Sequence, residues 1–149
     1  MTRIIAAAIF ATVIAGPVPG ARAQSANAYR ARLSPVPVAA VEAGSVSGSG
    51  SVTATLTGVT LSISGRFEGL ESPATVARVH RGAKKGIRGA VLFELQVSSA
   101  VAGTVSGAFE LTAPQAEDLN RERFYVQLHS EEHPEGHLWG WLLRQETRR

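Results

Sequence analysis

Apolar and polar residues alternate with a period of two in several short segments of this chain. Residues 51–56 read Ser-Val-Thr-Ala-Thr-Leu, so every second side chain is apolar, and the pattern recurs over residues 60–67, 89–97 and 101–111. Successive side chains of a β-strand point to opposite faces, so this alternation indicates strands with one buried face. Glycines interrupt the segments about every ten residues, which is typical of an antiparallel sandwich or barrel.

The segment 89–97 predicts the clearest core face. Its odd-numbered residues are apolar and are expected to point inward: Val91, Phe93, Leu95 and Val97. Leu92 falls on the opposite face and therefore needs a second apolar contact.

Further strands are expected over residues 29–33, 123–129 and 137–143, and in the segment that ends at His80. A loop over residues 130–136 joins the last two strands, because it contains a proline and a glycine. The whole is therefore predicted to be one all-β domain of seven or eight antiparallel strands.

One short helix is expected among these strands. Thr112 is followed three residues later by Gln115, which is the pattern of a capping box, and Pro114 is tolerated in a first helical turn. We expect this helix to run to about Leu119, whose side chain would anchor it to the core.

The first 23 residues have the layout of a secretory signal peptide. Arg3 supplies a positive charge, residues 4–15 form an unbroken apolar run, and residues 21–23 form an Ala-Arg-Ala cleavage site. The apolar run is shorter than the roughly 20 residues of a membrane-spanning helix. We therefore expect cleavage before Gln24, no transmembrane segment after cleavage, and a periplasmic or secreted protein.

The expected mature chain is long enough for one domain with its own core. We place a mobile lead-in at residues 24–28, the β domain at 29–143 and a C-terminal tail at 144–149. The full chain has 15 basic and 12 acidic residues, and two arginines leave with the signal peptide. The mature protein is therefore nearly neutral, which argues against a nucleic-acid partner. It has no cysteine, so its stability depends on core packing without disulfides.

Motifs for nucleophilic catalysis and for phosphate binding are missing from the sequence. There is no G-x-S-x-G motif and no cysteine, and the single aspartate, Asp118, lies on the predicted helix. The glycines around residues 48–50 are not followed by a nucleotide-binding pattern. We therefore expect a protein without catalytic residues.

Four histidines are the main concentration of reactive side chains: His80, His129, His133 and His137. If residues 130–136 form a hairpin loop, His129 and His137 lie opposite each other, with Cβ atoms about 5 Å apart. His80, at the end of another strand, is the third candidate ligand for copper or zinc. The alternative is that His80 and His129 are buried and bind loop backbone, while His133 is solvated.

Two tryptophans alternate with apolar residues near the C-terminus, so that Trp139 and Trp141 share one face of a strand. With Tyr125 on the preceding strand, they are candidates for a partner-binding surface. The alternative places them over the outer face of the sheet without a partner. The basic loop 81–88 is either solvated or attracted to anionic polymers.

Several short motifs, taken in their order along the chain, resemble those of the CHRD domain family. They span most of the chain from residue 29 to 143 and comprise residues 67–70 (Phe-Glu-Gly-Leu), 72–75 (Ser-Pro-Ala-Thr), 77–82 (Ala-Arg-Val-His-Arg-Gly), Gly89, 111–119, 125–129 (Tyr-Val-Gln-Leu-His) and 134–140 (Pro-Glu-Gly-His-Leu-Trp-Gly). The resemblance implies an immunoglobulin-like β-sandwich or barrel without enzymatic activity. His80 and His129 match the family pattern, whereas Arg78, His137 and Trp139 depart from it.

The sequence thus predicts a non-catalytic binding or structural module outside the cytoplasm, with a protein, a glycan or another envelope polymer as its partner. The alternative function is weak binding of copper or zinc through His80, His129 and His137. No other cofactor is expected.

Overall fold

The computed structural model describes residues 26–37 and 46–146 of the chain. The predicted signal peptide and cleavage site lie outside the described residues, as do the end of the tail and the segment 38–45. The elements in chain order are β1 (Ala26–Pro35), β2 (Ser49–Thr57), β3 (Thr60–Glu68), β4 (Ala74–Arg81), β5 (Ala90–Val97), β6 (Gly103–Glu110), α1 (Ala113–Asn120), β7 (Phe124–Ser130), β8 (Leu138–Trp141) and β9 (Leu143–Arg144).

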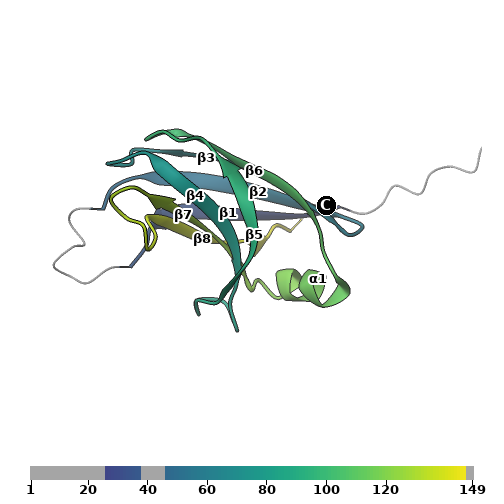
Figure 1. The fold of residues 1–149 in the computed structure, drawn as a ribbon. Helices are drawn as coiled ribbons and strands as arrows, with labels where there is room; N and C mark the ends of the chain where they lie inside the picture. The colour runs from purple at the N-terminus through teal and green to yellow at the C-terminus, as the bar shows by residue number, and fades with distance from the viewer. Residues whose placement is uncertain (1–25, 38–45, 147–149) are drawn as a thin grey trace, which may run out of the picture.

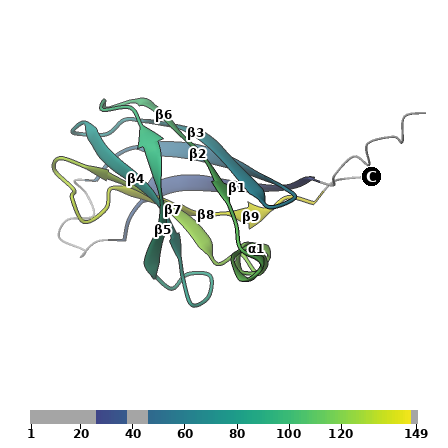
Figure 2. The same ribbon diagram turned by 45° about the vertical axis from the view of Figure 1, so that its right-hand side comes forward.

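Eight antiparallel strands close into a barrel. Their order is β2-β3-β6-β5-β4-β7-β8-β1, and β1 also pairs with β2, which completes the ring. The two-residue strand β9 adds to β1. Figures 1 and 2 show the strands wrapped around a common interior, with α1 at one end. The prediction of an all-β domain with one short helix is confirmed, and the described residues contain one strand more than expected.

The barrel consists of two halves joined by short ladders. Strands β1, β2, β3 and β6 pair along most of their lengths, and so do β5, β4, β7 and β8. The joins are the pairs Gln96–Ser106 and Val97–Val105 between β5 and β6, and Ser34–Trp139 and Pro35–Leu138 between β8 and β1.

The alternation places the predicted apolar faces of β2 and β3 in the core. Among the side chains that are almost completely buried are Leu33, Val52, Leu61, Val79, Leu119, Phe124, Leu128, Leu138 and Leu142. The first strand begins earlier than expected, because Ala26 to Ala28, predicted as lead-in, pair with β2.

One predicted core residue of β5, Val91, is not in the core. Val91 is 49 % exposed. Val79 pairs with Phe93, but the next residue, His80, pairs with Val91, so Leu92 is an extra residue at a bulge. A bulge of one residue reverses the faces of the residues on its far side, which turns Val91 outward.

The other predicted core residues of β5 do reach the interior. Leu95 is 4 % exposed, and Phe93, Val97 and Leu92 are partly buried against the core. The Phe93 ring stacks on Phe109 with 4.4 Å between ring centroids. The expected second contact for Leu92 is therefore present, through the bulge.

The predicted capping box is confirmed at the start of α1. The backbone N–H of Gln115 donates to Thr112 Oγ1, and the backbone N–H of Thr112 donates to Gln115 Oε1. Leu119 is fully buried, so it anchors the helix as expected.

Ion pairs join α1 to the neighbouring strands. Asp118 is buried, with 6 % of its surface exposed, and its carboxylate pairs with Arg123 and with Arg81 at the end of β4. Lys85, in the β4–β5 connection, pairs with Glu122 just after the helix. The helix and this connection therefore lie at the same end of the barrel (Figures 1 and 2). Among the described residues, no helix has the length and apolar character needed to span a bilayer.

Candidate functional site

Strand β7 is buried on both of its faces. Its even-numbered residues, such as Phe124 and Leu128, belong to the core. The odd-numbered ones, Tyr125, Gln127 and His129, face outward and are still 1 %, 4 % and 7 % exposed. Side chains of β4 and β8 and two loops therefore cover the outer face of this strand, where an antiparallel sheet is commonly solvated.

The outer face of β7 and β8 carries a packed aromatic group. Trp139 and Trp141 pack against the Tyr125 ring, with centroid distances of 5.8 and 4.7 Å, and lie 6.1 Å from each other. On its other side Tyr125 stacks with His80 at 4.8 Å. The Arg88 guanidinium lies 5.4 Å from the centroid of the Trp139 ring, in the range of a cation–π contact. We call Trp139, Trp141 and Arg88 the aromatic face.

The two tryptophans remain partly exposed, as the alternation predicted for side chains on an outer face. Tyr125, the third predicted contact residue, lies beneath them. Its hydroxyl is bonded to the amide and to the carbonyl oxygen of Gly89, at 3.1 and 3.3 Å. A Cβ at Gly89 would lie 1.8 Å from the Arg81 carbonyl oxygen, so only glycine permits this approach. Tyr125 therefore supports the aromatic face without forming its surface.

His80 and His129 lie on the same outer face and are neutral for a structural reason. Their Nδ1 atoms are bonded to the carbonyl oxygens of Gly89 and Pro134, at 3.1 and 2.8 Å. A carbonyl oxygen only accepts, so Nδ1 carries the proton and Nε2 is the bare nitrogen. Neither Nε2 atom has a partner among the described residues. Burial lowers the pKa of both rings, and the charge of Arg78 lowers it further.

The predicted metal ligands His80, His129 and His137 do not converge. Candidate clusters of three or more ligating side chains in the described residues do not include His80 or His129. His137 lies just before β8, so strand alternation does not set the direction of its ring. Its Nδ1 is bonded to Ser130 Oγ, and its Nε2 to the Ser47 carbonyl oxygen, whereas His129 is bonded to Pro134. The structure therefore gives no support to the predicted copper or zinc site.

A different set of side chains does meet. Glu71, His133 and His137 have potential ligand atoms that all lie within 4.8 Å of one another. Sequence reasoning treated His133 as solvated and did not consider Glu71, which comes from the distant β3–β4 connection. The sequence did hold one indication of this pair, because His133 and His137 are four residues apart. Here a loop, and not a helix, brings their rings together.

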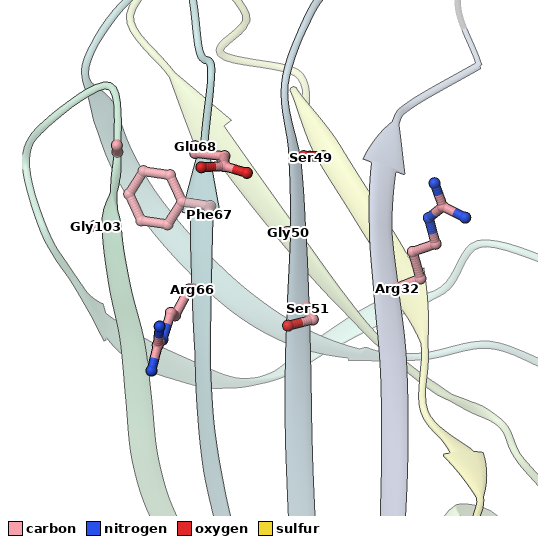
Figure 3. Close-up of a pocket in the computed structure, with 9 residues that line it drawn as sticks. Arg32, Ser49, Gly50, Ser51, Arg66, Phe67, Glu68 and Gly103 are labelled. Atoms are coloured by element: carbon pink, nitrogen blue, oxygen red, sulfur yellow. The ribbon is translucent and has the colours of Figure 1, made fainter.

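A surface depression lies elsewhere, on the outer side of β1, β2 and β3, and has a volume of about 650 Å³. Figure 3 shows Arg32 and Arg66 on opposite sides of the strand that carries Ser51, with Glu68 farther along. These polar groups do not converge on a common point, and none of them belongs to the aromatic face or to the group of Glu71, His133 and His137.

A comparison with family models matches the CHRD domain over residues 29–142. No curated protein and no solved structure is significantly similar to the chain.

Proposed function

This chain belongs to the CHRD domain family, and from that membership we propose that it is a non-catalytic binding or structural module that works outside the cytoplasm. The partner is a protein, a glycan or another envelope polymer. We propose in addition that the fold is an immunoglobulin-like sandwich, in which the two halves close into a barrel. The short β5–β6 and β1–β8 ladders support this relation, since two sheets that pack face to face need only such corners to close.

The aromatic face is the observation that carries the proposal. Tryptophan and arginine are the residue types most enriched among those that dominate binding energy at protein interfaces. Trp139 and Trp141 already pack against Tyr125, which limits the side-chain entropy lost when a partner covers them. Ile87 in the β4–β5 connection and Val91, opposite His80 in the ladder, add exposed apolar surface from neighbouring segments.

Several polar groups that could act as catalysts are bonded within the fold, which supports a non-catalytic role. Two arginines hold the Asp118 carboxylate, and the Nδ1 atoms of His80 and His129 are bonded to loop carbonyls. Export follows from the signal-peptide pattern of residues 1–23. N-terminal mass spectrometry on protein from the native host should find Gln24 as the first residue, and a mature product that retains Met1 would contradict export.

Binding through the aromatic face can be tested by co-sedimentation with the envelope fraction of the native host. The double variant Trp139→Ala/Trp141→Ala should lose at least about tenfold in affinity, because each anchor tryptophan commonly contributes more than this. The matched control is Val59→Ala/Val101→Ala, which removes exposed apolar side chains from turns outside the face. Equal binding by wild type and both double variants would exclude the aromatic face as the contact surface.

A further inference from the structure

Two loops that are distant in sequence meet at Glu71, His133 and His137. Glu71 lies between β3 and β4, and both histidines lie between β7 and β8. The His133 and His137 rings stand edge to face, with 4.7 Å between their centroids. His137 is completely buried, whereas Glu71 and His133 reach the surface, so the group has an inner anchor and an accessible side.

The ligand atoms of this group lie within 4.8 Å of one another, close enough to approach one metal ion. Glu71 Oε2 lies 3.0 Å from His137 Nε2 and 3.9 Å from His133 Nε2. Ligand atoms bound tetrahedrally at about 2.1 Å from a zinc ion lie about 3.4 Å apart. The observed values lie on either side of this spacing, and the two accessible side chains have room to adjust.

The surroundings of His137 also suit a metal ligand. A ligating histidine normally has its second ring nitrogen held by a hydrogen bond. His137 Nδ1 lies 2.7 Å from Ser130 Oγ, which also accepts a bond from the His133 amide. A serine hydroxyl can donate or accept. It can therefore donate to Nδ1 in the observed tautomer, in which Nε2 donates to the Ser47 carbonyl oxygen, and accept from Nδ1 in the tautomer in which that bond is released and Nε2 binds a metal.

The carboxylate supplies negative charge beside the two rings. Burial alone raises the pKa of the Glu71 carboxyl, but hydrogen bonds from Ser47 and the backbone and the nearby His137 outweigh this, so the pKa is lowered overall. Glu71 is therefore ionised at neutral pH. Two imidazole nitrogens and one carboxylate suit zinc and similar transition ions, whereas calcium and magnesium prefer oxygen ligands.

We propose that Glu71, His133 and His137 bind one divalent transition ion of the zinc class and thereby join the β3–β4 and β7–β8 connections. This set shares only His137 with the three histidines selected from the sequence. The site is independent of the aromatic face, and binding there does not require the proposed partner.

The test uses the chain without a polyhistidine tag, stripped of metal with a chelator and titrated with zinc chloride in a calorimeter. We expect one zinc ion per chain, and a Tm that rises by on the order of 10 °C when zinc is in hundredfold excess over its Kd. Calcium chloride should produce neither effect. The absence of stoichiometric zinc binding, or equal binding of calcium, would overturn the proposal.

Substitutions at the accessible ligands identify the site without disturbing the buried ring of His137. Glu71→Gln and His133→Ala should each weaken zinc binding at least about tenfold and reduce the rise in Tm. The matched control Glu135→Gln removes an exposed carboxylate from the same β7–β8 connection and should bind zinc like the wild type. Zinc binding that is unchanged in both ligand variants would place the ion elsewhere and refute the assignment.

Discussion

At the scale of single residues, the bulge in β5 gives neighbouring apolar side chains opposite roles. Leu95 is buried in the core, whereas Val91 is half exposed on the outer face. We expect Leu95→Ala to cost about 2–5 kcal/mol of unfolding free energy. Val91→Thr should stay within about 0.5 kcal/mol of the wild type. Urea unfolding of the two variants checks this, and a large loss in Val91→Thr would mean that the bulge is absent in solution.

The buried histidines predict a pH dependence of stability. Burial lowers the folded-state pKa of His80 and His129 below 6.5, while unfolding restores the ordinary value. In the range between these two values the unfolded chain binds more protons. The stability associated with the neutral rings is therefore complete above about pH 6.5 and is lost as the pH falls toward the folded-state values.

Urea unfolding at about pH 7.5 and about pH 5.5 measures this effect. The wild type should be less stable at the lower pH. The double variant His80→Gln/His129→Gln, which has no titrating ring at these positions, should show a smaller difference between the two conditions. A loss of the same size in both proteins would attribute the pH dependence to other groups.

At the scale of elements, α1 is short and depends on its first turn. The capping box satisfies two backbone groups that the helix itself leaves unpaired. Thr112→Ala should cost about 1 kcal/mol. Glu117→Ala, on the exposed side of the same helix, removes only a surface pair with Arg121 and should cost no more than about 0.5 kcal/mol. Thermal unfolding compares the two, and an equal cost would show that the cap contributes nothing specific.

The same elements show which features sequence patterns could predict. The capping box and the buried faces of β2 and β3 depend on residues within one segment, and both were predicted correctly. The bulge at Leu92 was missed because one extra residue leaves the apolar pattern of β5 unchanged. The meeting of Glu71 with His133 was missed because packing between two distant loops creates it, and the spacing of His133 and His137 does not point to Glu71.

At the scale of the whole molecule, the two short joins have the fewest paired residues in the ring. The β8–β1 join includes Pro35, which has no amide proton to donate, and the β5–β6 join has only two residue pairs. The ladders between β1 and β2 and between β2 and β3 extend along nearly the full strands. Local opening requires less free energy where fewer hydrogen bonds and buried contacts break together.

Native-state hydrogen exchange should therefore divide the barrel into two cooperative halves. Amides at residues 96–97 and 138–139 should exchange through local opening, at a lower free energy than amides in the middle of β2 and β3. The amides of β2 and β3 should exchange only through global unfolding, so Leu95→Ala should speed their exchange by the factor that corresponds to its loss of stability. Equal protection of the joins and the long ladders would mean that the closed ring opens as one unit, because its corners are then as stable as its sheets.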